Sequence, residues 1–314
     1  VDYVTARREL ASDDPSRSAL WTKHLMECHA LAALYSETDS ASHWEQCRHV
    51  YQSFVDLQPT NPRIPWLQWQ VSRCDLLHAQ SEMALYLAAP ANQAPREQAL
   101  GLIRKMLSEL EQLDDDVARR QPRAAREGLQ GAAEAPAEQL NALAVDAGLL
   151  RCEALLLRTR LYPLQSADRI ASATEVDQQA AAWLQRTIAA SAIKEQLQVA
   201  QATARLELGD ESSALRELER LASTASGETA RQRAAIAAIE NMTRLKDDAR
   251  NNASVEMSRA RALLELLQAD EAGPEAELAS MHIALADLQR HSGGAKQAAL
   301  QALLAQSLHI GAQY

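Results

Sequence analysis

The sequence is poor in the residues that build β-structure. Aromatic residues are only 4% of the 314, Phe54 is the single phenylalanine, and glycine occurs only 10 times. Sheets favour β-branched and aromatic residues, and their tight hairpin turns need glycine. Alanine and leucine dominate the apolar residues instead. We therefore expect an all-α protein.

The common signatures of enzymes are also missing. The chain contains no GxGxxG, GxxxxGK[ST], HExxH or GxSxG motif. Its carboxylates stand beside arginines at helical spacing, as in Glu217 and Arg220, which is typical of exposed helix faces. We predict a non-enzymatic protein without a cofactor or metal. The alternative is a helical enzyme whose catalytic residues come together only in space.

Charge and hydropathy exclude further classes of partner. The formal net charge is −10 at pH 7, whereas binding to nucleic acid needs concentrated lysine and arginine. No apolar run approaches the roughly 18 residues that a membrane span needs. We therefore expect neither a nucleic-acid partner nor a membrane span. The chain starts at Val1, so we expect a trimmed start, and localisation stays open.

The four cysteines are too few and too scattered for a disulfide framework, and we expect buried free thiols at Cys28, Cys47, Cys74 and Cys152. His24 and Cys28 form one i,i+4 pair, and His43 and Cys47 form another. A helical turn near residue 38 would separate the two imidazoles by roughly 15 Å in height. This separation excludes a zinc site, while a Cys28–Cys47 disulfide stays open in an oxidising compartment.

Proline spacing and apolar periodicity predict a chain of helices with mostly short connections. No proline occurs between Pro163 and Pro274, which leaves that window free for uninterrupted helices. A short helix is expected within the first dozen residues. The other expected helices cover residues 16–36, 41–58, 64–88, 95–120, 136–161, 168–190, 192–208, 212–224, 228–247, 253–269, 275–291 and 295–309.

One longer connection interrupts this pattern. Residues 121–135, QPRAAREGLQGAAEA, combine a proline, two glycines and several arginines. Such a composition favours a loop or hinge. It would separate N-terminal helical hairpins at 1–120 from further hairpins at 136–314, unless the whole chain is one continuous array.

Two stretches near the C-terminus share a pattern of small residues. The first is Ala202-x6-Gly209-x4-Ala214, followed by Leu218 and Leu221. The second repeats these spacings at Ala286, Gly293, Ala298, Ala302 and Ala305. One further hairpin lies between them, which gives a period of about 42 residues per hairpin, within the range of helical solenoids. Gly209 is expected to end one helix, and Asp210 or Ser212 to cap the next.

This pattern resembles the tetratricopeptide repeat, best over the last 120 or so residues. The resemblance implies an α-α superhelix, a solenoid of antiparallel hairpins that binds a protein or peptide in its groove. It implies that the groove is lined by Gln196, Val199, Thr203, Leu206, Glu207, Ile283, Asp287 and Arg290. The alternatives are a helical enzyme or small-ligand-binding protein, and a purely structural spacer.

A second candidate surface comes from the residue types alone. Trp66, Trp69, Gln70 and Arg73 share one helix face, and tryptophan and arginine are enriched at binding hot spots. We predict a partner-binding patch there. The alternative is that both tryptophans pack against the preceding hairpin near Trp44 and Tyr51.

Overall fold

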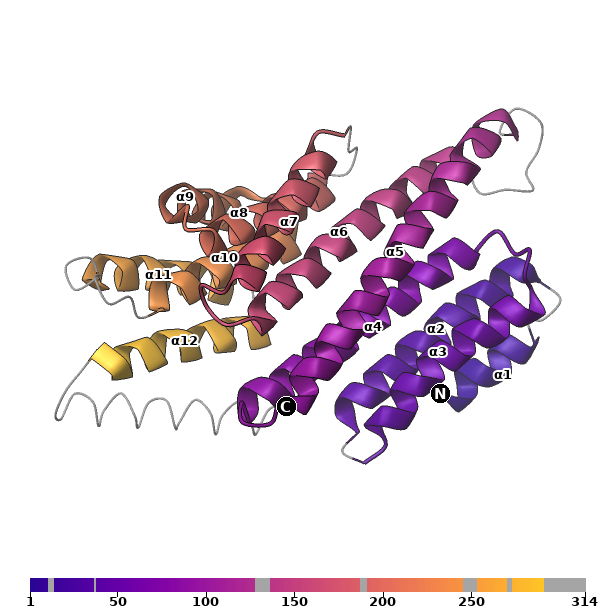
Figure 1. The fold of residues 1–314 in the computed structure, drawn as a ribbon, viewed down its shortest axis with the longest axis horizontal. Helices are drawn as coiled ribbons and strands as arrows, with labels where there is room; N and C mark the ends of the chain where they lie inside the picture. The colour runs from indigo at the N-terminus through magenta and orange to yellow at the C-terminus, as the bar shows by residue number, and fades with distance from the viewer. Residues whose placement is uncertain are drawn as a thin grey trace. The chain divides into compact units, whose positions relative to one another are not determined.

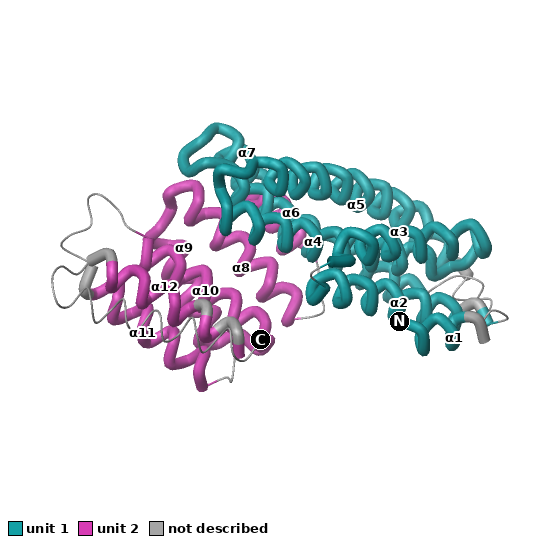
Figure 2. Tube along the Cα trace, turned by 90° about the horizontal axis from the view of Figure 1, so that it is seen from below, with its two compact units in different colours: residues 1–175 teal, residues 176–314 magenta. Residues whose placement is uncertain are grey.

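The computed structural model describes residues 1–10, 14–36, 38–127, 136–186, 191–244, 253–269 and 273–290 (Figure 1). Within these ranges the regular structure is entirely α-helical, and no strand is present. The predicted all-α class is confirmed. The chain divides into two compact units, Val1–Glu175 and Val176–Tyr314, which are coloured separately in Figure 2.

The first unit contains six complete helices. They are α1 (Asp2–Leu10), α2 (Pro15–Tyr35), α3 (Ser40–Leu57), α4 (Ile64–Ala88), α5 (Ala94–Glu127) and α6 (Ala137–Leu161). The next helix, α7 (Ala167–Leu184), begins in the first unit and ends in the second.

The second unit adds five described helices. They are α8 (Ser191–Glu207), α9 (Glu211–Thr224), α10 (Glu228–Thr243), α11 (Ala253–Ala269) and α12 (Pro274–Arg290). Most observed ends lie within a few residues of the predicted ones. The expected helix at 295–309, and with it the second copy of the Gly–Ala pattern after Ala286, lies outside the described residues.

Helix ends form where the local sequence supplies the missing hydrogen bonds. The Asp14 carboxylate accepts hydrogen bonds from the backbone N–H groups of Ser16 and Arg17 and so caps α2. At the end of α8, Gly209 has a φ of +90°, and the Asp210 N–H donates to the Arg205 carbonyl over 3.0 Å. This is the left-handed helix end that glycine favours. The Asp210 side chain makes no cap to α9; it accepts from the Ser213 hydroxyl instead.

Helix α5 runs further than its sequence predicts. The expected loop at 121–135 begins with seven helical residues, because α5 continues through Pro122 to Glu127. An apolar stripe that includes Val117 and Ala124 stays buried across the proline and shares a core with Leu140 of α6. The segments before and after 121–135 therefore pack together, and the two compact units separate within α7.

The first unit has two apolar cores on opposite faces of α4. Leu67, Val71 and Cys74 face the core built by α2 and α3, while Leu76 and Ala79 face the core built by α5 and α6. Because α4 is apolar around most of its circumference, it is suited to burial between two layers.

The second unit has one continuous core. Leu218 and Leu221 of α9 and Met242 of α10 are buried within it, together with residues of α8, α11 and α12. Helices α8 and α9 pack against each other, so the predicted hairpin is confirmed. Helix α10 contacts α8, α9, α11 and α12 and is the central helix of this core.

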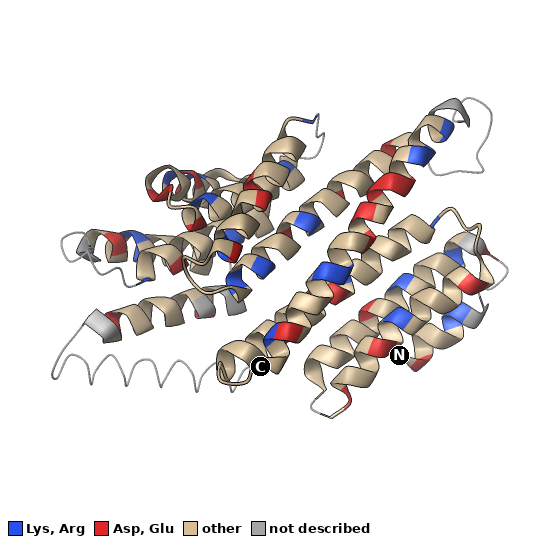
Figure 3. Cartoon of the chain, viewed as in Figure 1, with Lys and Arg blue, Asp and Glu red and all other residues tan. Residues whose placement is uncertain are grey.

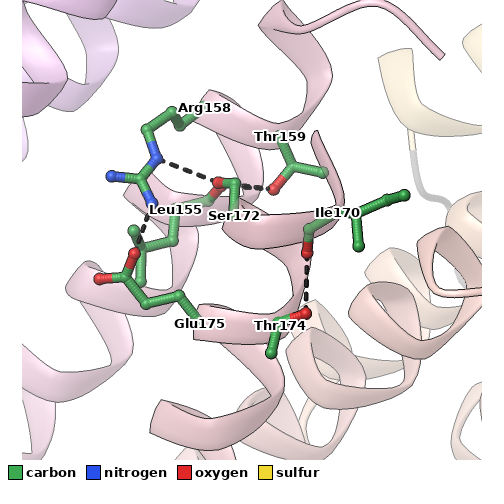
Figure 4. A network of polar contacts seen from close by, with 7 residues as sticks. All are labelled: Leu155, Arg158, Thr159, Ile170, Ser172, Thr174 and Glu175. Atoms are coloured by element: carbon green, nitrogen blue, oxygen red, sulfur yellow. Dashed lines mark hydrogen bonds and ion pairs between the residues drawn. The ribbon is translucent and has the colours of Figure 1, made fainter. Parts of the chain in front are cut away.

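Helix neighbours follow the order of the chain. Among the described helices, every pair with substantial packing is separated by one or two places in the sequence order, as in α2 with α3 and α4. The start of α7 is fixed on α6 by hydrogen bonds, since Arg158 donates to Ser172 and Glu175, and Thr159 donates to Ser172 (Figure 4). The described helices therefore pack mainly against helices that are close to them in the sequence order.

Candidate binding cleft in the first unit

Polar side chains of three helices line a cleft in the first unit. Its volume is about 420 Å³, within the range of sites that hold small molecules or short peptide segments. It is lined by Arg48, His49, Tyr51 and Gln52 of α3, Gln68 and Val71 of α4, and Lys105, Glu109 and Gln112 of α5. Val71 is the one aliphatic residue among them.

Charged side chains that line the cleft form a network with Asp75, which is buried next to it. Arg48 donates one hydrogen bond to the Asp75 carboxylate and a second, of 3.2 Å, to Glu109 Oε1. Lys105 Nζ lies 3.9 Å from the same Glu109 oxygen. Gln68 of α4 donates to the backbone carbonyl of Glu109 and joins α4 to α5. In Figure 3, residues of both charge signs are interspersed along α5.

Three side chains at or beside the cleft, those of Asp75, Glu109 and Tyr51, are in unusual environments. Burial, opposed by Arg48, raises the pKa of Asp75 from 3.8 to about 7. Glu109 Oε2 is buried and has no hydrogen-bond partner in the structure. The pKa of Tyr51 is raised by burial, with smaller effects of Glu109 and Asp116. A buried acceptor without a donor costs free energy, so a donor that reached Glu109 Oε2 would be bound favourably.

The interior beside the cleft is held by ring stacking. The imidazole of His78 stacks on Trp44 with 4.7 Å between ring centroids and 7° between planes. Burial, and secondly the charge of Arg48, lower the pKa of His78 to about 4, so the ring is neutral at pH 7. The neutral stack packs without a buried charge and supports the α3–α4 contact.

The predicted tryptophan patch is only partly exposed to solvent. Trp66 and Trp69 are half-buried against the core of α5 and α6, and not against Trp44 and Tyr51 as the alternative predicted. Guanidinium groups of Arg63 and Arg73 cover their rings at 5.1 and 5.7 Å. Gln70 faces the interior and is buried, whereas Arg73 is exposed.

Four of the eight predicted groove residues in the second unit are buried. Val199, Leu206 and Ile283 are members of the buried core, and Thr203 is buried with its hydroxyl bonded to Val199. The helix face assigned to the groove therefore faces neighbouring helices, because α8 packs with both α9 and α10.

The polar members of that set have other surroundings. Gln196 is partly buried, Glu207 accepts a hydrogen bond from Arg244 over 3.1 Å, and Asp287 pairs with Arg261 at 2.8 Å. Arg290 ends α12, and its side chain is outside the described part of the chain. Glu207 and Asp287 therefore pair with different arginines.

The histidine and cysteine pairs behave differently from a zinc site. His24 contacts Glu27, while His43 lies 3.2 Å from His29 between their Nδ1 atoms. All four cysteines are free thiols, and Cys47, Cys74 and Cys152 are buried. A hydrogen bond with Cys74, followed by burial, raises the pKa of the Cys47 thiol. Within the described ranges, no cluster of three or more metal-ligating side chains is present.

Sequence reasoning did not identify the cleft, although two signals point to it. Lys105, Glu109 and Gln112 follow steps of four and three, which place them on one face of a helix. Asp75 stands between the apolar residues Cys74 and Leu76, and a buried carboxylate needs a cationic partner. That partner, Arg48, is 27 residues away in sequence, so the pairing becomes visible only in the fold.

Comparisons with models of known families, with curated proteins and with solved structures found no match to this chain. Among the described helices, none combines the length and apolar character needed to cross a membrane.

Proposed function

We propose that the protein is a non-enzymatic binding module of stacked helical hairpins, and that a protein or peptide partner binds at the α3–α4–α5 cleft. The cleft carries this proposal, because polar side chains from three helices converge there on a space of about 420 Å³. Rigid helices hold these side chains in place, which limits the entropy lost on binding.

The order of helix contacts supports the solenoid part of the proposal. Packing between helices one or two places apart is the pattern of a repeat array, in which each hairpin contacts its neighbours. The resemblance of the Gly209–Ala214 joint to a tetratricopeptide repeat agrees with such an array. Repeat arrays present extended surfaces that suit protein partners.

A small-molecule ligand is the second candidate. The cleft volume lies within the range of small-ligand sites, and its lining combines donors and acceptors of both charge signs. This candidate predicts that a metabolite, and not a protein, is retained by the cleft.

Affinity capture from cells of the source organism tests the proposal. Gln112→Trp places a bulky side chain at the exposed rim, whereas Ala118→Trp changes an exposed residue of α5 outside the cleft. We expect quantitative mass spectrometry to find a protein that wild type and Ala118→Trp retain and Gln112→Trp loses. Equal retention by all three, or no specific protein, would contradict the proposal; a small molecule retained in the same pattern would favour the second candidate.

A further inference from the structure

The charged side chains at the cleft differ in exposure. The Lys105 side chain is 53% exposed, Arg48 is 29% exposed, Glu109 is 23% exposed and Asp75, which does not line the cleft, only 7%. A cation, Lys105, is therefore the most exposed of the four, and Arg48 and Glu109 are similarly exposed. A ligand that approaches from solvent meets positive charge first, in a chain whose formal net charge is −10.

The two cations keep hydrogen-bond donors that the network does not use. Lys105 Nζ is 3.9 Å from Glu109, beyond hydrogen-bond distance, and an ammonium group carries three N–H donors. Arg48 directs one N–H to Glu109 and one to Asp75, out of five on a guanidinium group. The buried carboxylates fix the orientation of the guanidinium, so its remaining donors are held in place.

Resting on the proposed function, we propose that the cleft binds an anionic oxygen group of the partner, a carboxylate or a phosphoryl group, at the N–H donors of Lys105 and Arg48 that Glu109 and Asp75 do not use. Lys105 at the rim makes the first contact, and Arg48 receives the group deeper in the cleft. Gln112 and Tyr51, which also line the cleft, supply neutral donors beside the anion.

A cationic group is a poorer fit for the same site. It would meet the exposed ammonium group of Lys105 first, and like charges repel each other. Glu109 Oε2 is buried and has no hydrogen-bond partner, and it is suited to accept a hydrogen bond from a neutral donor of the ligand.

Titration of the isotope-labelled full-length protein with simple anions tests this inference without any partner. Inorganic phosphate represents the phosphoryl source and succinate the carboxylate source, with sodium chloride used to hold ionic strength constant. We expect saturable shifts of backbone amide signals at Gln112 and Gln52 with at least one probe, and the stronger probe identifies the source.

Two variants on α5 make the test specific. Lys105→Gln removes the rim cation, and Arg104→Gln removes a neighbouring exposed cation that does not line the cleft. Lys105 is more than half exposed, so its replacement leaves the fold intact, which the spectrum itself verifies. We expect Lys105→Gln to bind the anion about tenfold more weakly, as for the loss of one charge-assisted hydrogen bond. Arg104→Gln should bind it as tightly as the wild type.

Unsaturable shifts with both probes, or equal weakening by both variants, would overturn the inference. That result, combined with a captured protein that Gln112→Trp loses, would leave the proposed function standing and reject only the anionic ligand. Saturable anion binding without a captured protein would reject the protein partner and leave the anion site.

Discussion

At the scale of single residues, two glycines have opposite roles. Gly209 ends α8 with a φ of +90°, where any side chain strains the backbone, while Gly101 lies inside α5 with nothing within 4 Å of an added Cβ. We expect Gly209→Ala to lower the free energy of unfolding by about 1 kcal/mol. Gly101→Ala should raise it by roughly 0.5–1 kcal/mol, because alanine is the better helix former.

Urea denaturation followed by circular dichroism measures both changes. A neutral or stabilising effect of Gly209→Ala would show that the left-handed helix end is not required. A destabilising effect of Gly101→Ala would reveal a close contact that the structure does not contain.

The buried carboxyl of Asp75 makes stability depend on pH. Its pKa is 3.8 in a free chain and about 7 in the folded protein, so the folded state binds more protons between these values. Its contribution to stability therefore falls as the pH rises from about 4 through 7. We expect the stability of wild type relative to Asp75→Asn to be greater at pH 5 than at pH 8. Chemical denaturation at the two pH values measures this difference, and a constant difference would place Asp75 in a solvated environment.

Features set by residues adjacent in the sequence were easier to predict than features set by packing between helices. The Gly209 helix end was predictable because its signals, a glycine after an apolar stripe and a small residue in the next helix, are adjacent in sequence. The Arg48–Asp75 pair was not, because its members are on different helices and neither has a local signal for the other. The burial of Val199 and Leu206 was missed because α8 packs on two helices instead of one.

At the scale of helices, α10 depends on a residue of another helix for its start. The Glu195 carboxylate of α8 accepts hydrogen bonds of 3.0 Å from the backbone N–H groups of Ser226 and Gly227. The Ser226 N–H bond is the first cause of the lowered pKa of Glu195, so this contact weakens as the pH falls through and below the ordinary value of 4.5.

Glu195→Ala should expose the two backbone amides that directly precede α10. We expect protection from hydrogen exchange at Ser226 and Gly227 to fall about fivefold to tenfold, the loss typical of a helix cap. Exchange measured at pH 7 by mass spectrometry or nuclear magnetic resonance checks this, with Lys194→Ala as the control at an exposed neighbouring residue. Equal protection in Glu195→Ala and wild type would mean that α10 starts without the carboxylate.

Helix positions were largely predictable from periodicity and proline placement. The exception is α5, which continues to Glu127 although the composition of residues 121–135, including Pro122, predicts a loop. A proline in the last turns of a long helix disrupts few hydrogen bonds, and the buried stripe that includes Ala124 stabilises the helix beyond it. Tertiary packing thus outweighed the local signal.

At the scale of the whole molecule, the two compact units differ in the surfaces that they offer to a partner. The first unit combines two cores with a charged cleft, whereas four of the eight predicted groove positions in the second unit are buried. If the first unit holds the recognition site, substitutions at the cleft should affect binding more than substitutions at Gln196 or Asp287. Affinities of Gln112→Trp, Gln196→Ala and Asp287→Ala for one captured partner check this expectation.

Site-specific photo-crosslinking in living cells tests the central claim most directly. A benzophenone amino acid is placed at Gln112 on the rim of the cleft, and at Ala118 of the same helix as the control. The proposal predicts one defined protein adduct from position 112, reduced by the additional change Lys105→Gln, and no such adduct from position 118. No adduct from 112, or the same adduct from both positions, would contradict a partner-binding cleft between α3, α4 and α5.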